Sequence, residues 1–390
     1  MKVALVTMVF PHPRQGVWPG IERHTGELAG ALAREGAEVT VLTTFWNGGE
    51  EHETWKGIEI LRVPDTGWKW GKAGRLLNAH VHSFGRNLLR HSDRLKRMDA
   101  IHSFVGLSRG KDLAALGVPL FSSFPHRDKP ERLHDALGQY RDFRTERRFF
   151  PLASAVFAGS LEARRVLIDE YRLDPSRVHV VPLGVNGDVF TPPEKGRPGV
   201  PWDERPQGLR LLYIGPLIRR KGLYTLIEAL PVVARSSIPF RLSMVGRGPE
   251  EASLRALAGR LGVADRIDFA GFVAEPELVR WYQNADIFIF PSTREGFGLV
   301  LVEAMACGLP IVVSDVAPMP EVVGGAGVLF AHSDPADLAA GILKVAKDPD
   351  LRMRLSREGR RLVEEKYLWR RVARQTLDHY ERAISRAVAV

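Results

Sequence analysis

Two glutamates lie close together in one segment, and one of them stands where a carboxylate is uncommon. Glu295 precedes a Gly-Phe-Gly turn (296–298), and Glu303 lies in the following stretch, which is apolar on every side. Glycines allow a ligand to approach the backbone closely, and a helix that is apolar all round is a buried one. A buried carboxylate must meet a cation or several hydrogen-bond donors, because an unpaired charge is costly there. For Glu303, the hydroxyls of a sugar or ribose diol satisfy that need, and a structural ion pair of Glu303 with a cation such as Lys221 is the alternative.

A group of cations follows an earlier apolar run. The turn from Gly215 to Lys221 contains Arg219 and Arg220 and stands just before a helical stretch. Cationic side chains beside the free N–H groups of a helix N-terminus suit a phosphate group. A basic loop tip in solvent is the alternative interpretation. Gly246 ends a further strand in a tight turn of a common kind.

The first half of the chain is less explicit. Gly20 stands before a helix that begins near Ile21, where it could admit a ligand or simply close a turn. His102 and His126 each end a strand. A histidine at such a place can hydrogen-bond a ligand or transfer a proton, and a surface histidine without a role is the alternative.

Parallel strands are needed to bring these residues together. Short apolar runs alternate with amphipathic helical stretches, and several runs are apolar at nearly every position, as strands covered on both faces are. The predicted strands are 2–8, 38–44, 57–63, 99–104, 118–124 and 154–159, followed by 209–215, 240–246, 266–272, 285–291 and 310–315. Such alternation forms parallel sheets, which bind ligands beyond the carboxyl ends of their strands. Because the series occurs twice, it predicts an α/β protein with two doubly wound, Rossmann-like domains.

The length of 390 residues also favours two domains. Residues 191–208 are rich in proline and charge without periodicity, which is the composition of a linker. We therefore expect one domain over 1–190 and a second over 209–368. The last predicted helix, at about 369–388, is expected to return to the first domain.

The composition restricts the partners. The net charge of +9 favours an anionic partner: nucleic acid, a phosphorylated small molecule or an acidic membrane surface. A single cysteine, Cys307, excludes a disulfide framework, and no apolar run is long enough to span a bilayer, so a cytoplasmic protein is expected. Much of the excess charge lies in 68–97, where tryptophans precede a helical stretch with one apolar and one arginine-rich face. That segment predicts either peripheral contact with anionic lipids on the inner membrane face or a sheet-packed helix with a solvated basic side.

Several signature motifs are absent. The first strand is not followed by G-x-G-x-x-G, and the chain has no G-x-x-x-x-G-K-[ST], which argues against a dinucleotide enzyme and a P-loop ATPase. Histidines and carboxylates lack metal-ligand spacing, so we expect no metal and no cofactor. The basic residues accompany no recognition motif, which argues against nucleic-acid binding.

Residues 285–315 carry the most specific pattern. Their sequence, ADIFIFPSTREGFGLVLVEAMACGLPIVVSD, resembles the signature of the retaining nucleotide-sugar glycosyltransferases of family four, with Glu295 and Glu303 as the E-x₇-E pair. Further family features recur in order at 21–43, 180–190, 214–222, 245–250 and 327–330. The resemblance covers nearly the whole chain and implies the GT-B fold, in which two Rossmann-like domains face each other across a cleft.

The resemblance also implies roles for single residues. Lys221 matches the lysine that neutralises the donor diphosphate, and Glu303 matches the carboxylate that holds the ribose hydroxyls. Glu295 belongs to the loop that lies against the transferred sugar, with its neighbours Gly296, Phe297 and Gly298. Further donor-binding positions are implied at Gly215, Gly246, Phe272 and Val273, of which the last two would face the nucleotide base.

In the first domain, Gly20 matches a glycine near the phosphates, and His126 is similar in position to the family's active-site histidine. Two positions depart from the family pattern. Pro216 stands where an arginine is usual, so Arg219 or Arg220 would have to supply the second cation. The usual pair of glycines in the first-domain loop is Pro19-Gly20 here.

The implied activity is metal-independent, retaining transfer of a hexose-type sugar from a nucleotide-diphosphate sugar to an acceptor held by the first domain. The acceptor would be a glycolipid, a polysaccharide or a small molecule. Two alternatives remain at this point: an epimerase of the same fold that acts on the nucleotide sugar itself, and a catalytically silent protein that binds nucleotide sugars.

Overall fold

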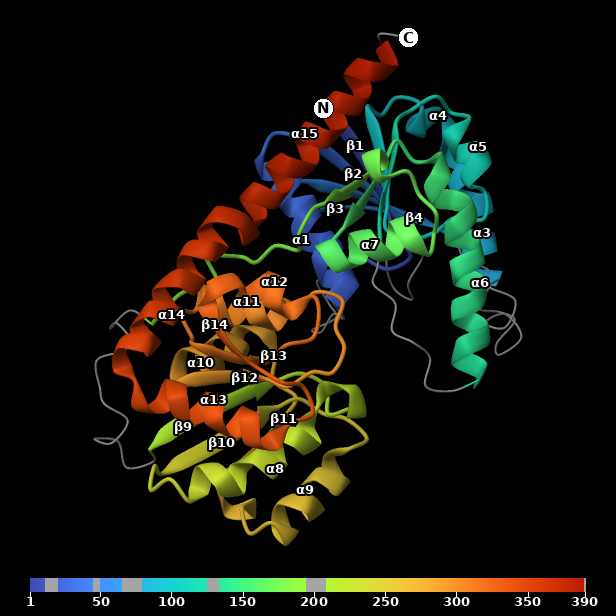
Figure 1. Cartoon of the computed structure of the whole chain (residues 1–390). Coiled ribbons are helices and arrows are strands. Elements are labelled where there is room, and N and C mark those ends of the chain that lie inside the picture. Colours follow the sequence, from blue (N-terminus) through green and yellow to red (C-terminus); the bar gives the residue numbers. More distant parts are fainter. Residues whose placement is uncertain (11–19, 45–49, 65–78, 125–132, 194–207, 389–390) are drawn as a thin grey trace. The chain divides into compact units, whose positions relative to one another are not determined.

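The structure is a computed structural model that describes residues 1–10, 20–44, 50–64, 79–124, 133–193 and 208–388. The chain divides into two compact units, Met1–Gly184 with Trp369–Val390, and Val185–Leu368. Each unit is a β-sheet covered by helices (Figure 1). Among the described residues, every helix is too short or too polar to cross a membrane.

The first unit contains a sheet of eight strands in the order β3-β4-β2-β1-β5-β6-β7-β8. The strands are β1 (Lys2–Val6), β2 (Glu38–Thr44), β3 (His52–Trp55), β4 (Ile58–Val63), β5 (Ala100–Ser103), β6 (Leu120–Ser123), β7 (Ala155–Ala158) and β8 (Val178–Val180). All neighbours pair in parallel except β3, which runs antiparallel to β4. The strand order reverses between β1 and β5, which makes their carboxyl ends the switch point of this sheet.

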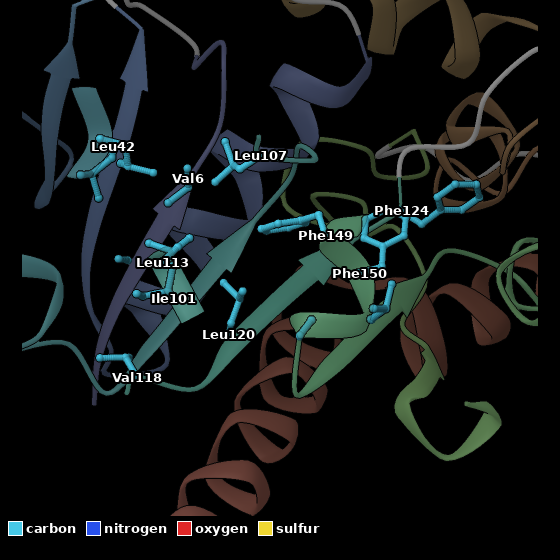
Figure 2. Close-up of a cluster of buried hydrophobic side chains, with 14 of the residues drawn as sticks. Val6, Leu42, Ile101, Leu107, Leu113, Val118, Leu120, Phe124, Phe149 and Phe150 are labelled. Atoms are coloured by element: carbon cyan, nitrogen blue, oxygen red, sulfur yellow. The ribbon is translucent and has the colours of Figure 1, made fainter. Parts of the chain in front are cut away.

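Helices cover both faces of that sheet. On one face, α1 (Gly20–Arg34) and α15 (Trp369–Val388) share a core with Val3 and Leu5 of β1. On the other face, Ala4 and Val6 of β1 lie in the core of Figure 2. The remaining helical elements of this unit are α3 (Ala79–Leu88), η2 (Leu89–His91), α4 (Ser92–Leu95), α5 (Gly110–Ala114), α6 (Leu133–Phe149), η3 (Phe150–Leu152), α7 (Leu161–Asp169) and η4 (Pro175–Arg177). Alternate residues of a central strand thus fill two cores, as a doubly wound sheet requires.

The second unit contains a parallel sheet of six strands in the order β11-β10-β9-β12-β13-β14. The strands are β9 (Leu209–Ile214), β10 (Phe240–Val245), β11 (Ile267–Gly271), β12 (Ile287–Phe290), β13 (Ile311–Ser314) and β14 (Gly327–Phe330). The helical elements are η6 (Arg219–Lys221), α8 (Leu223–Ala234), α9 (Glu251–Arg260), η7 (Ala264–Arg266), α10 (Glu275–Asn284), α11 (Leu299–Ala306), α12 (Met319–Val323), η8 (Gly324–Ala326), α13 (Pro335–Lys347), α14 (Pro349–Leu362) and η9 (Val363–Tyr367). Here the order reverses between β9 and β12, so the loops after these two strands meet at the switch point.

The prediction of two parallel α/β units is confirmed, and every predicted strand segment contains an observed strand. The last helix, α15, belongs to the first unit, where the Tyr380 hydroxyl lies 2.6 Å from Nδ1 of His102. Most of the expected linker, 194–207, lies outside the described residues.

The basic segment 68–97 is described from residue 79 onward. Its apolar side chains Phe84, Leu88 and Leu95 are buried in the core beneath the sheet. On the other side, Arg94 forms an ion pair with Glu59 of β4. For these residues the structure favours the sheet-packed interpretation.

Candidate active site

An ion pair joins the two loops at the switch point of the second unit. The ammonium of Lys221, in the loop after β9, pairs with Oε1 of Glu295, in the loop after β12. Both side chains are buried, each with 9% of its surface exposed. The Ser292 hydroxyl donates to the same Oε1 at 2.8 Å, and the guanidinium of Arg220 lies 3.9 Å from it. Two cations thus share one carboxylate, which leaves this edge of the sheet suited to an anion.

The two loops fit together by backbone contacts that need a glycine. Gly222 has a φ of +66°, and a Cβ there would lie 1.9 Å from the carbonyl oxygen of Pro291. Thr293 donates to the Arg220 carbonyl oxygen from its N–H at 2.9 Å and from its hydroxyl at 3.0 Å. The Lys-Gly sequence at the start of α8 therefore fixes where the Lys221 side chain begins.

The structure separates the two arginines proposed for the missing cation. Arg220 donates to the Arg294 carbonyl oxygen at 3.3 Å and lies beside Glu295. Arg219 is exposed, and its guanidinium lies 5.5 Å from the ring centre of Tyr224. Of the two, Arg220 is the one beside the ion pair.

A hydrogen bond from a buried tyrosine of β9 stabilises the turn that begins at Gly215. The Tyr213 hydroxyl donates to the Pro216 carbonyl oxygen at 2.9 Å. Burial, reinforced by Glu295, raises the pKa of Tyr213, so this hydroxyl keeps its proton and remains a donor. Gly246 has a φ of +141°, and a Cβ there would lie 1.9 Å from the Gly215 carbonyl oxygen. Gly246 therefore allows the loops after β9 and β10 to lie against one another.

Glu303 is buried in α11, as the apolar pattern predicts. Its Oε2 accepts a hydrogen bond of 2.8 Å from the hydroxyl of Tyr282, which is itself fully buried. A carboxylate has about four acceptor positions, so Glu303 can accept from Tyr282 and from ligand hydroxyls together.

The Gly-Phe-Gly turn leads directly into α11. Phe297 is buried, and its ring meets that of Tyr367 edge-on at 5.8 Å. Gly298, the residue before α11, has a φ of +88°. A ligand at this turn would therefore contact the backbone of Gly296 and its neighbours, with the Phe297 ring turned into the protein.

Phe272 and Val273 follow β11 at the same edge of the sheet. The Phe272 ring is 48% exposed, which is unusual for so large an apolar side chain, and Val273 is half-buried. An exposed aromatic face at this edge of the sheet is a surface on which a base can stack.

In the first unit, Gly20 is the first residue of α1, and His126 lies outside the described residues. His102 is fully buried at the end of β5, with its Nε2 2.8 Å from the Ser123 hydroxyl. Burial lowers the pKa of His102 to about 3, so the ring is neutral at physiological pH. It is a structural group that holds Ser123, the last residue of β6.

Sequence reasoning did not single out Ser292 or Tyr282. The buried Glu303 carboxylate signalled that a donor was needed. Tyr282 lies in another helix, however, and only the packing of α10 brings it there.

Comparison with known proteins covers both halves of the chain. Residues 18–189 match the family described as Glycosyltransferase Family 4, and residues 201–362 match Glycosyl transferases group 1. A D-inositol 3-phosphate glycosyltransferase from Paenarthrobacter aurescens is 28% identical, over 98% of each chain. An uncharacterised glycosyltransferase from Methanocaldococcus jannaschii is 27% identical over 98% of this chain and 99% of its own length.

Solved structures resemble the whole chain as well. Sucrose-phosphate synthase from Thermosynechococcus elongatus has a TM-score of 0.77 at 22% identity, covering 98% of this chain and 99% of its own. Anabaena HepE, solved in complex with UDP-glucose, has a TM-score of 0.68 at 18% identity, covering 97% of this chain and 98% of its own. These similarities confirm the predicted GT-B fold.

Proposed function

The chain belongs to the glycosyltransferases of family four, and from that premise we propose that it transfers a hexose-type sugar from a nucleotide-diphosphate sugar with retention of anomeric configuration and without a metal ion. The second unit would bind the donor, and the first unit would bind the acceptor. The observation that carries the proposal is the buried Lys221–Glu295 pair at the switch point of the second unit.

Lys221 and Arg220 would stabilise the leaving diphosphate. Negative charge grows on the diphosphate as the bond to the sugar breaks, so fixed cations bind the transition state more strongly than the ground state. Glu295 and Ser292 hold the Lys221 ammonium in place before the donor arrives. Because this group is already oriented and buried, little reorganisation is needed during the reaction.

Glu303 and the exposed Phe272 ring would position the nucleoside. Glu303, held through Tyr282, would accept hydrogen bonds from the ribose hydroxyls. The Phe272 ring, with Val273, would lie against the base. The backbone of Gly296 and Gly298 would then lie along the transferred sugar.

Two comparisons suggest the first substrates to test. HepE was solved with UDP-glucose, which makes uridine diphosphate sugars the first donors. Several relatives are named D-inositol 3-phosphate glycosyltransferases, which makes that phosphate the first acceptor.

The decisive experiment incubates the purified chain with a panel of nucleotide sugars, with and without acceptors, in the presence of EDTA. Release of nucleoside diphosphate that depends on the acceptor supports glycosyl transfer, and NMR of the product assigns its anomeric configuration. Conversion of the donor without an acceptor would instead indicate the epimerase. Donor binding without turnover, with every acceptor tried, would indicate a silent binding protein.

A further inference from the structure

A polar pocket lies in the first unit, at the β7 and β8 end of the sheet and away from its switch point between β1 and β5. It has a volume of about 520 Å³ and is lined at one side by Ser154 and Ala155, where β7 begins, and by Ser176 and Arg177, just before β8. The other wall is the last part of α15. Because parallel sheets of this kind bind substrates at the carboxyl ends of their strands, a pocket at the amino ends is separate from the proposed active site.

Three arginines line this pocket. Arg382 and Arg386 stand one turn apart on α15, and neither forms an ion pair or hydrogen bond with any residue that the structure describes. Arg177 donates to the Pro151 carbonyl oxygen at 3.2 Å. By contrast, Arg374 of the same helix pairs with Glu35 at 2.8 Å. The described lining of the pocket includes no carboxylate that could neutralise these cations.

Two stacked histidines complete the wall. His179 of β8 and His379 of α15 have ring centres 4.3 Å apart. Burial lowers the pKa of both rings, that of His379 to about 4. Arg382 lowers both further, and Arg164 of α7 and Arg386 act on His179 in the same direction. Both rings are therefore neutral near pH 7, where each offers one N–H donor.

Carboxylates lie beside the pocket on two sides. Asp174, just before η4, accepts from the Ser176 N–H at 2.9 Å, and its hydrogen bonds with Ser176, followed by the charge of Arg177, lower its pKa. Asp378 and Glu381 line a shallower hollow of α15 together with Arg382 and Arg386. Asp378 raises the pKa of His379, but burial and the cations outweigh that effect. The described lining of the pocket itself carries three arginines and no carboxylate.

We propose that this pocket binds a phosphate-bearing ligand, held by Arg177, Arg382 and Arg386 and by the N–H groups of the histidine pair. Guanidinium groups bind phosphate oxygens in a bidentate manner, and the volume accommodates a phosphorylated small molecule or the head of a phospholipid. Such a ligand supplies the negative charge that the described lining lacks.

Binding of this kind is coupled to proton uptake. A phosphate beside His179 and His379 favours their charged forms, so it raises the pKa of both rings, and binding strengthens as the pH falls. A bound phosphate would raise the pKa of the two histidines, whereas the arginines lower it. An upward change of the pKa of His379 would therefore report that the pocket is occupied.

The test follows the His379 ring by NMR in the full chain with labelled histidine, while inorganic pyrophosphate is added at pH 6. We expect the His379 signal to move toward that of imidazolium, while those of the buried His24 and His102 stay in place. His379→Gln assigns the signal. An unmoved His379 signal overturns the proposal, even if calorimetry records pyrophosphate binding at the proposed donor site.

Two double variants give a matched comparison. In R382A/R386A, the pyrophosphate concentration that gives half of the His379 shift should be at least about tenfold higher than in the wild type. R370A/R371A removes the same charge from exposed positions of the same helix and should leave the response unchanged. Equal responses in both variants contradict the proposal.

Vesicles then identify the source of the phosphate. Co-sedimentation with phosphatidylglycerol vesicles, lost in R382A/R386A but kept in R370A/R371A, assigns the site to a lipid headgroup. A pyrophosphate response without vesicle binding assigns it to a soluble phosphorylated ligand. Absence of the pyrophosphate response overturns the proposal, whether or not the vesicles bind.

Discussion

Lys221 and Glu295 are 74 residues apart in the chain, and their side chains meet as a buried ion pair between neighbouring loops. Lys221 shortly precedes α8 and Glu295 shortly precedes α11, and the residue directly before each helix is a glycine in the left-handed region, Gly222 and Gly298. Removing one member leaves a buried charge, whereas removing both leaves none. Comparing single and double variants of Lys221 and Glu295 therefore distinguishes the contribution of the pair to folding stability from its contribution to catalysis.

Lys221→Met alone should destabilise the second unit by about 3 kcal/mol, because Glu295 is left as a buried carboxylate with Ser292 and the more distant Arg220. Lys221→Met/Glu295→Gln should recover most of that loss. Urea unfolding of the two variants beside the wild type measures the difference. Equal destabilisation in both would mean that the charge of Glu295 is not compensated mainly by Lys221.

Tyr282→Phe should cost about 1–3 kcal/mol, since it removes the hydroxyl that donates to the buried Glu303. We also expect the KM for the donor to rise more than kcat falls, because Glu303 is proposed to bind the ribose. Phe330→Leu serves as a control that alters packing in the same unit, on β14, without touching this hydrogen bond or the proposed donor site. A Tyr282→Phe variant with unchanged stability and KM would rule out this positioning role.

Gly222→Ala should destabilise by about 2–5 kcal/mol, the sum of a left-handed backbone and a clash with the Pro291 carbonyl oxygen. Gly36→Ala is the matched control, since its φ is +91° but a Cβ there meets nothing within 4 Å. It should cost only about 1–2 kcal/mol. If thermal unfolding shows equal losses, close packing of the two loops is not what requires glycine.

Arg220→Ala should lower kcat/KM about 10²-fold, as removal of one group that stabilises the transition state typically does. Arg219→Ala should stay within about threefold of the wild type, because its guanidinium is exposed and faces Tyr224. Steady-state kinetics with one donor and one acceptor compares them directly. The reverse order would assign the second cation to Arg219.

Stability should fall as the pH is lowered from about 6.5, the ordinary pKa of histidine. Burial lowers the pKa of His102 to about 3, so the unfolded chain takes up a proton that the folded chain excludes. The stabilisation is complete above pH 6.5 and is lost progressively as the pH falls toward 3. Between pH 7 and 5, His102 alone should account for roughly 2 kcal/mol.

His102→Gln keeps a hydrogen-bonding side chain between Tyr380 and Ser123 but cannot titrate. It should therefore show a smaller loss of stability between pH 7 and 5 than the wild type. Urea unfolding at the two pH values provides the test, and parallel losses in the two proteins would contradict the assignment. Burial also lowers the pKa of His24 to about 4, and because His24 helps to lower the pKa of His102, the two contributions are coupled.

The sequence predicted most of the fold because central parallel strands are apolar on both faces. The strands it did not predict, β3, β8 and β14, all lie at the edge of a sheet. They are short and only partly buried, as the burial pattern of β3 shows, so they lack the continuous apolar run on which the prediction depended.

The sequence identified the residues of the candidate site, but it did not show which of them contact one another. The spacing of Glu295 and Glu303 is a local property, whereas the partners of each come from other elements. Lys221 meets Glu295 because β9 and β12 are neighbours, and Tyr282 meets Glu303 because α10 packs near α11. A sequence without its sheet order cannot distinguish Glu295 from Glu303 as the partner of Lys221.

The central claim is that the loops around Lys221 and Glu295 form the donor site, and the most direct measurement is acceptor-dependent release of nucleoside diphosphate by Lys221→Met/Glu295→Gln. We predict that this variant unfolds close to the wild-type urea midpoint while its kcat/KM falls at least about 10²-fold. A folded variant that turns over at close to the wild-type rate would contradict the account.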